Sequence, residues 1–294
     1  MKNTATAVPF PVDSAVLRLI QFALHEDIGT GDITSDLSIE PSTQGAARFL
    51  LKEDAVVCGM PIIPIIFRQL SDSLNIDLLV DEGSFQKANT VLATVTGPAL
   101  ALLSGERTAL NFLQRMSGVA TKTRTYVDRI AGTNAHVLDT RKTIPAWRLL
   151  DKYATRVGGA KNHRMGLFDM VMIKDNHITA CGGIRQAVER VSAELSGRTS
   201  VKIEVEARSI DDVHEVLSCK GVHRVMFDNF TPTQVAEGVG IVNNTIETEA
   251  SGGITYENIL DYALTGVDYI SVGAITHSAV AVDISMKLVV PRAG

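Results

Sequence analysis

The first 130 residues mix helical and extended hydrophobic patterns, which predicts helices and strands in irregular order. Apolar residues recur at helical spacing from Val16 to Leu24, with Asp13 or Ser14 as the N-cap. Short extended patterns predict strands, and one helical pattern falls between them; the strands are expected at residues 46–51, 55–58, 76–80 and 91–95, and the helix at 61–70. A long amphipathic helix begins near Ser104. This region is typical of a small α+β domain with a mainly antiparallel sheet.

From residue 135 the pattern changes to a strict alternation of strand and helix. Strands are expected at 135–138, 170–174, 201–205, 223–227, 245–248 and 269–272, and helices at 146–157, 184–195, 210–217, 232–239 and 256–264. Regular alternation predicts parallel strands joined by right-handed crossovers. There are six such units, whereas a complete (β/α)₈ barrel needs eight. An incomplete barrel and an open doubly wound sheet are both compatible with the pattern.

Each predicted strand of this second region ends in polar residues or glycine. The strand ends are residues 139–142, 174–176, Glu204 with Glu206, Asp228 with Asn229, 251–253 and Gly273. In parallel α/β folds the ligand site lies at the carboxyl ends of the strands. A barrel would bring these ends around one mouth.

Positive side chains gather at two of these strand ends. They are Arg141, Lys142, His163, Arg164 and Lys174. Their number predicts a ligand with several negative charges, as carboxylates, phosphates or both. Three roles are possible for Lys174, because a lysine at the end of a buried strand can bind an anion, form a Schiff base, or extend to water.

Carboxylates and glycines at the other strand ends are further candidates for binding a ligand at the barrel mouth. Glu204 and Glu206 lie on the same face of one strand, and Asp228 ends the next. Such carboxylates can bind ribose hydroxyls, hold Mg²⁺ or stabilise a developing cation, and alternation alone does not separate Glu204 from Glu206. The turn at 251–253 can cradle a phosphate with its backbone N–H groups.

Composition narrows the class of partner. The 294 residues carry a net charge of −5, and no run of five or more Lys and Arg occurs, so nucleic acid is not an expected partner. The longest apolar stretch, residues 60–67, is short and broken by prolines, which predicts no membrane span. Cys58, Cys181 and Cys219 show no disulfide or metal spacing, and we expect a cytoplasmic protein.

Taken together, the motifs resemble one family. They are 25–34 (HEDIGTGDIT), 105–111 (GERTALN), 139–143 (DTRKT), 162–164 (NHR), 173–177 (IKDNH), 228–230 (DNF), 251–253 (SGG) and 272–274 (VGA). In this order they resemble quinolinate phosphoribosyltransferase, also called carboxylating nicotinate-nucleotide pyrophosphorylase. The resemblance runs from about residue 20 to residue 285.

This resemblance implies a fold and a reaction. The expected fold class is α/β, with an N-terminal α+β sandwich domain at 1–124 and an incomplete, six-stranded parallel α/β barrel at 125–279; residues 280–294 would pack back on the sandwich. The reaction would transfer the phosphoribosyl group of phosphoribosyl pyrophosphate (PRPP) to quinolinate, with Mg²⁺. It would yield nicotinate mononucleotide, pyrophosphate and CO₂ for de novo NAD biosynthesis.

The resemblance also implies a role for each candidate residue. Carboxylates of quinolinate would be held by Arg141, His163, Arg164 and Lys174, with Lys142 in the same pocket or at the pyrophosphate. Ribose and metal would face Glu204, preferred over Glu206, and Asp228. The 5′-phosphate would be held by Ser251, Gly252, Gly253, Gly273 and Ala274. Arg107 would reach the site of a neighbouring subunit, which implies at least a homodimer.

Three other functions fit the same residues. One is a transferase of the same fold with a different acceptor, against which the two arginines Arg141 and Arg164 argue. Another is a Schiff-base aldolase that uses Lys174. The third is a protein that binds a phosphosugar without catalysis.

Overall fold

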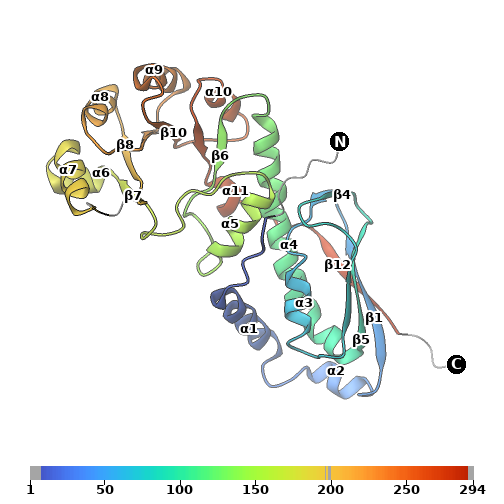
Figure 1. The fold of residues 1–294 in the computed structure, drawn as a ribbon. Helices are drawn as coiled ribbons and strands as arrows, with labels where there is room; N and C mark the ends of the chain where they lie inside the picture. Colours follow the sequence, from blue (N-terminus) through green and yellow to red (C-terminus); the bar gives the residue numbers. More distant parts are fainter. Residues whose placement is uncertain (1–7, 196, 198–199, 291–294) are drawn as a thin grey trace. The chain divides into compact units, whose positions relative to one another are not determined.

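The computed structural model describes residues 8–195, 197 and 200–290, which divide into two compact units (Figure 1). The first unit takes in the chain up to Arg124, Ile144–Gly159 and the segment from Ser278. The second, here called the barrel unit, comprises Thr125–Thr143 and Ala160–His277. No helix among the described residues is both long and apolar enough to cross a membrane.

An antiparallel sheet forms the centre of the first unit. Its strands, in spatial order, are β12 (Ile284–Val289), β1 (Gln44–Leu51), β5 (Val91–Pro98) and β3 (Asn75–Leu78). Two short strands, β2 (Ala55–Val56) and β4 (Phe85–Gln86), pair separately. Along β1 the residues Ala47, Phe49 and Leu51 are fully buried while their neighbours are not, as expected for a sheet with one face in the core. The last described strand therefore returns to the sheet of the first unit.

Helices complete the core of this unit. They are α1 (Ser14–Ile28), α2 (Ile33–Ser38), α3 (Ile62–Phe67), most of α4 (Ala99–Arg129) and α5 (Arg148–Val157). Asp13 caps α1 by accepting a hydrogen bond from the Ala15 amide, and Asp32 caps α2 by accepting from the Ser35 amide. Gly29 has a positive φ of 55° at the end of α1. The motif at 25–34 is thus the connection between two helices.

Six parallel strands form the barrel unit. In chain order they are β6 (His136–Leu138), β7 (Val171–Ile173), β8 (Ile203–Ala207), β9 (Arg224–Asp228), β10 (Glu247–Ser251) and β11 (Tyr269–Ser271). Their spatial order is β6-β11-β10-β9-β8-β7, so the last strand pairs with the first. This cyclic order is that of a barrel, and the pairing between β6 and β7 is the one that is missing. The prediction of an incomplete six-stranded barrel is confirmed.

Helices cover the outer face of this sheet (Figure 1). They are α6 (Asp175–Cys181), α7 (Ile184–Glu194), α8 (Ile210–Ser218), α9 (Pro232–Val242), α10 (Ile259–Ala263) and α11 (Ala274–His277). The short helices α6 and α11 had no counterpart among the expected elements, because one or two turns are too short to show a helical period. Strand β8 also begins two residues later than expected, at Ile203.

One element lies in a different unit from the one expected. The sequence placed residues 144–159 in the barrel, between its first two strands, but they belong to the first unit. The apolar face of α5, formed by Leu150, Tyr153, Ala154 and Val157, is part of the hydrophobic core of that unit. Helical periodicity reports that a face is buried, but not against which partner.

Gly118 on α4 offers a test of the packing in the first unit. A Cβ atom at this position would clash with the carbonyl oxygen of Val280, a backbone atom that cannot swing away. We expect Gly118→Ala to lower the free energy of unfolding by about 1–3 kcal/mol, the usual cost of overpacking. Gly240→Ala on α9 is the matched control, because nothing lies within 4 Å of its added Cβ, and Ala favours a helix over Gly by up to about 1 kcal/mol. Denaturant unfolding of both variants measures the difference, and equal stability would contradict the packing described.

Candidate active site

A cavity of about 410 Å³ opens at the carboxyl ends of the barrel strands. Its wall comes from the loops that follow β6, β7, β9 and β10 and from the segment before β7. Most of the candidate residues line it; these are Arg141, Lys142, His163, Arg164, Lys174, Asp228, Ser251, Gly252 and Gly253. Residues separated by more than 110 positions therefore share one cavity in the barrel unit, as the strand-end pattern predicted.

Three of the cations at the mouth, Arg141, Lys142 and Arg164, are not paired with acids among the described residues. Arg141 and Lys142 are exposed on the loop after β6, and among the described residues neither they nor Arg164 form an ion pair. Burial lowers the pKa of Arg164, and the nearby positive charge of Arg141 lowers it further. Two guanidinium groups held this close favour an anion between them.

Lys174 stands between solvent and the acidic residues of β8. Its side chain is 45% exposed, and its Nζ lies 3.7 Å from Glu206 Oε2. Its backbone forms the N-cap of α6, where His177 Nδ1 accepts a hydrogen bond from the Lys174 amide. The helix start thus fixes the position from which the ammonium enters the cavity.

Asp139 anchors the loop that carries the Asn-His-Arg motif. This carboxylate is fully buried; it accepts hydrogen bonds from the Asn162 side chain and the His163 amide, each at 2.7 Å. Lys161, the residue before Asn162, forms a parallel β-bridge to Leu138 of β6. We had not assigned a role to Asp139, although its place directly after a strand of the barrel was a usable signal.

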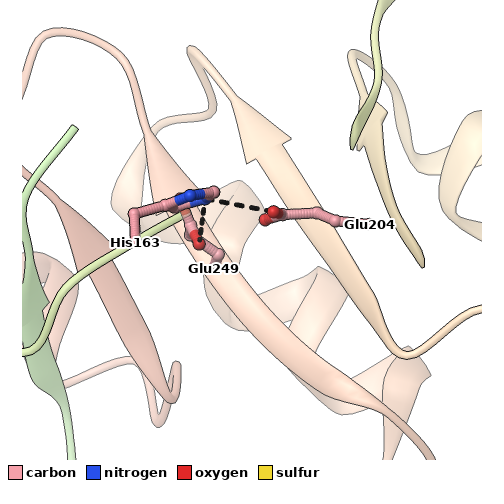
Figure 2. A group of neighbouring side chains, drawn as sticks. All are labelled: His163, Glu204 and Glu249. Atoms are coloured by element: carbon pink, nitrogen blue, oxygen red, sulfur yellow. Dashed lines mark ion pairs between the residues drawn. The ribbon is translucent and has the colours of Figure 1, made fainter. Parts of the chain in front are cut away.

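His163 is turned into the barrel (Figure 2). Its Nε2 lies 3.1 Å from Glu204 Oε2 and 3.5 Å from Glu249 Oε2, and its Nδ1 accepts a hydrogen bond from the Arg164 amide at 2.7 Å. Burial alone would lower the pKa of His163, but the two carboxylates raise it, because both attract a proton on Nε2. We had expected this histidine to bind a carboxylate of the ligand, whereas the structure directs both ring nitrogens at protein atoms.

The two glutamates of β8 occupy different levels of the barrel. Glu204 is fully buried beside His163, and neither it nor Glu206 is among the residues that line the cavity. Burial, together with the charge of Glu249, raises the pKa of Glu204 to about 7. Glu206 lies one layer nearer the mouth, where burial raises its pKa and the neighbouring Asp228 adds to this. Glu206 is thus the glutamate that lies beside Asp228, while the preference for Glu204 as the group that faces ribose and metal stays a prediction.

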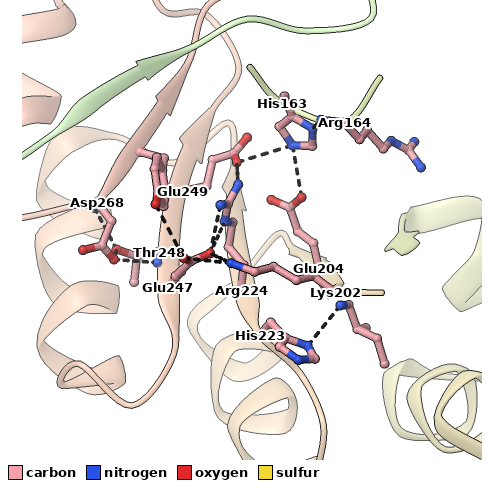
Figure 3. Close-up of polar contacts among 12 residues, drawn as sticks. His163, Arg164, Lys202, Glu204, His223, Arg224, Glu247, Thr248, Glu249 and Asp268 are labelled. Carbon is pink, nitrogen blue, oxygen red and sulfur yellow. Dashed lines mark hydrogen bonds and ion pairs between the residues drawn. The ribbon is translucent and has the colours of Figure 1, made fainter. Parts of the chain in front are cut away.

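Below His163 the interior of the barrel is charged (Figure 3). Arg224 donates to Glu249 at 2.8 Å and to Glu247 at 2.9 Å, and the Ser271 hydroxyl donates to Glu249. His163 and this arginine lower the pKa of Glu249 against the effect of burial. The interior of the barrel is thus a connected network of acids and bases.

The glycine turn after β10 packs against the loop after β9. Gly252 has φ +94°, and a Cβ there would lie 2.9 Å from the Asn229 amide nitrogen and closer still to the Asn229 side chain. The Asn229 amide in turn donates to the Ser251 carbonyl at 2.8 Å. Only glycine allows this approach. The turn can therefore present backbone N–H groups to an anion such as a phosphate.

Besides Glu204, three candidates lie outside the lining of the cavity described above. Gly273 ends β11 and supports Lys142, since a Cβ there would lie 3.0 Å from Lys142 Cδ. Ala274 begins α11. Arg107 is exposed on the part of α4 that belongs to the first unit. Unpaired cations, a pair of carboxylates and a glycine turn together suit a ligand with carboxylate and phosphate groups.

Comparison with known proteins points to one family over nearly the whole chain. Residues 32–117 match the family described as quinolinate phosphoribosyl transferase, N-terminal domain, and residues 119–287 match its C-terminal domain. The chain is 42% identical to a decarboxylating quinolinate phosphoribosyltransferase of Nicotiana tabacum, over 98% of this chain and 89% of the relative. It is also 42% identical to a probable carboxylating nicotinate-nucleotide pyrophosphorylase of Bacillus subtilis, over 92% of both chains. The solved nicotinate-nucleotide pyrophosphorylase of Francisella tularensis has the same fold, with a TM-score of 0.90 and 38% identity over 96% of this chain and 98% of that one.

Proposed function

The chain belongs to the quinolinate phosphoribosyltransferase family, and on this premise we propose that it transfers the phosphoribosyl group of PRPP to quinolinate. The products are nicotinate mononucleotide, pyrophosphate and CO₂, a step toward NAD. One observation carries the proposal beyond the family match: Arg141 and Arg164 lie close together in the cavity without an acidic partner in an ion pair among the described residues. A pyridine with two adjacent carboxylates supplies the two negative charges that this pair needs.

We assign the substrate groups by the charge that lines the cavity. Arg141, Arg164 and Lys174 hold the carboxylates of quinolinate, and the turn from Ser251 to Gly253 holds the 5′-phosphate. Lys142 extends from the loop after β6 to the pyrophosphate. His163 contributes through its position beneath these groups and not as a direct donor.

The reaction separates charge, and the residues are placed for it. When the bond between ribose C1 and pyrophosphate breaks, positive charge develops on the sugar and negative charge on the leaving group. Glu206 and Asp228 favour the first, and Lys142 favours the second. The pyridine nitrogen then bonds to C1, and the positively charged ring stabilises the carbanion left as the adjacent carboxylate departs as CO₂. This carbon takes up a proton from water to give nicotinate mononucleotide. The arginines act by orientation, since they fix the ring nitrogen toward C1.

The acidic pair at the mouth also fits Mg²⁺. Glu206 Oε2 is buried and accepts no hydrogen bond from a described residue, and Asp228 lies beside it. Oxygen ligands from one or two carboxylates, completed by water and substrate phosphates, are what Mg²⁺ prefers. Bound there, Mg²⁺ would supply positive charge to the pyrophosphate. Glu206 thus takes the place that Glu204 held in our expectation.

A second subunit completes our proposal. Arg107 is exposed and forms no ion pair among the described residues. The surface of α1 and α2 beside this part of α4 exposes Phe22 at 74% and Ile33 at 72%. Exposed apolar side chains around a free cation are typical of a protein interface. We propose that a homodimer forms here, with Arg107 entering the partner's cavity.

The cytoplasmic location stays a prediction. Relatives of this chain from Nicotiana glauca and Arabidopsis thaliana carry names that place them in mitochondria and chloroplasts. Localisation of the tagged protein in its own cell would decide it.

The reaction itself gives the first test. Purified protein mixed with quinolinate, PRPP and Mg²⁺ is expected to release nicotinate mononucleotide, pyrophosphate and CO₂ in equal amounts. Chelation of the metal with EDTA is expected to stop turnover, and added Mg²⁺ to restore it. Chromatography of the nucleotide and trapping of labelled CO₂ measure both products. Pyrophosphate release with another acceptor but not with quinolinate would refute the assignment.

Arg141→Ala tests which ligand the arginine pair binds. We expect KM for quinolinate to rise by roughly tenfold to a hundredfold, the effect of losing a charge-assisted hydrogen bond. KM for PRPP should change by less than about threefold, because the phosphate turn is untouched. Arg156→Ala, an exposed arginine in the first unit, is the control. Equal losses for both substrates would contradict the role given to Arg141.

Mixed dimers test the role of Arg107. At quinolinate concentrations well below the wild-type KM, Arg107→Ala and Arg141→Ala subunits are each expected to be nearly inactive alone. If Arg107 acts across the dimer, random mixing restores one intact site in half of the dimers, or about a quarter of wild-type activity. Co-expression with two different tags, followed by purification and assay, measures this. No recovery on mixing would show that Arg107 acts within its own chain or not at all.

A further inference from the structure

Beneath the cavity lies a pair of buried acids that the reaction as proposed does not use. Glu204 on β8 and Glu249 on β10 are fully buried, and neither lines the cavity. The interior of a barrel is normally filled by branched apolar side chains. A buried carboxylate costs several kcal/mol unless partners compensate it. This pair therefore points to a role beyond the filling of space.

Glu204 has a single close polar partner. Its Oε2 lies 3.1 Å from His163 Nε2 as an ion-pair contact, and neither of its oxygens accepts a hydrogen bond of good geometry from any described residue. Glu249 differs, because Arg224 and Ser271 also donate to it. The ring of His163 is thus the group with which the Glu204 carboxylate forms an ion pair (Figure 2).

The other edge of this ring reaches the backbone at the cavity. His163 Nδ1 accepts a hydrogen bond from the Arg164 amide at 2.7 Å. From there the Arg164 side chain turns away from the acids, and its Nη1 donates to the Met170 carbonyl at 3.3 Å (Figure 3). The ring therefore connects the buried acids below with the residue whose guanidinium lines the cavity above.

We propose that Glu204 is a positioning residue, which fixes the His163 ring from below and through it the backbone and guanidinium direction of Arg164. It touches neither substrate, and it acts on the affinity for the acceptor. The inference rests on the proposed function in one respect, namely that the anion held by Arg164 is the dicarboxylate.

A metal ion is the rival explanation for this group of residues. One ligand atom each from His163, Glu204 and Glu249 lies within 4.8 Å of the others, a spacing that a cation could use. However, the Glu249 oxygen that faces His163 is also the one that lies 2.8 Å from the Arg224 guanidinium. A cation already neutralises this carboxylate, which favours a network of protein groups.

Steady-state kinetics on Glu204→Ala test the proposal. We expect KM for quinolinate to rise roughly tenfold, about the effect of one hydrogen bond to a charged group, while KM for PRPP stays within about twofold. Glu204→Gln should recover most of this loss, because its amide oxygen keeps the same contact with His163 Nε2, and it also serves if the alanine variant does not fold. The control is Glu247→Gln, which removes an acid of the same network that contacts Arg224 and Lys202 but not His163; its KM for quinolinate should not change.

A double mutant separates positioning from general structure. If Glu204 acts only through the ring, Glu204→Ala adds no loss to His163→Ala. Additive losses, an equal rise in both KM values, or a glutamine variant no better than the alanine variant would overturn the proposal. So would a stoichiometric metal in the purified wild type that Glu204→Gln loses.

A crystal structure of unliganded Glu204→Ala keeps this test independent of the substrate assignment. A rotated His163 ring with a displaced Arg164 is expected. An unchanged orientation of the His163 ring would refute the positioning role even in an active enzyme. Failure of the wild type to use quinolinate would instead refute the proposed function, and the structural result would remain valid.

Discussion

The guanidinium groups of Arg141 and Arg164 at the mouth of the barrel form one layer, and the buried carboxylates of Glu204 and Glu249 form another below it. The site depends on keeping these two layers apart. Direct pairing of the two layers would neutralise Arg141 and Arg164 and leave nothing to bind an anion. The acids act instead from a distance, since the charge of Glu204 partly offsets the repulsion that Arg164 receives from Arg141. His163 fills the space between the layers and prevents Glu204 from closing on the guanidinium groups. The cations are therefore stabilised while they remain available.

This layering explains why the sequence predicted the mouth better than the interior. A residue directly after a parallel strand lies at the same edge as every other such residue, so Arg141, Lys174, Asp228 and the turn at 251–253 could be grouped without coordinates. No comparable sequence pattern shows how deep inside the barrel a residue within a strand lies. The direction of the His163 ring depends on Glu249, 86 positions away, and on the hydrogen bonds of Asp139. Contacts of that kind are set by tertiary packing and not by any local pattern.

The two glutamates of β8 show this limit most clearly. Alternation places Glu204 and Glu206 on one face, and it gives no reason to prefer either. Strand β8 runs to Ala207, two residues beyond the expected end at 205, so the residue nearest the mouth is Glu206 and not Glu204. The preference for Glu204 came from the family resemblance, whereas the observed end of the strand places Glu206 one layer of the barrel nearer the mouth. Strand boundaries are the least reliable part of any such prediction, and at this site they decide the chemistry.

The missing pairing between β6 and β7 has a use in this fold. A closed barrel would satisfy every edge with another strand, whereas here Lys161 pairs with Leu138 along the free edge of β6. Asp139 then fixes the Asn162 side chain and the His163 amide just beyond that bridge. The open edge thus admits a loop whose side chains enter the barrel from the side, His163 toward the acids and Arg164 toward the cavity. With six strands, the edge between β6 and β7 leaves room for His163, which lies between the guanidinium groups and the buried acids. A seventh strand at this edge would exclude it.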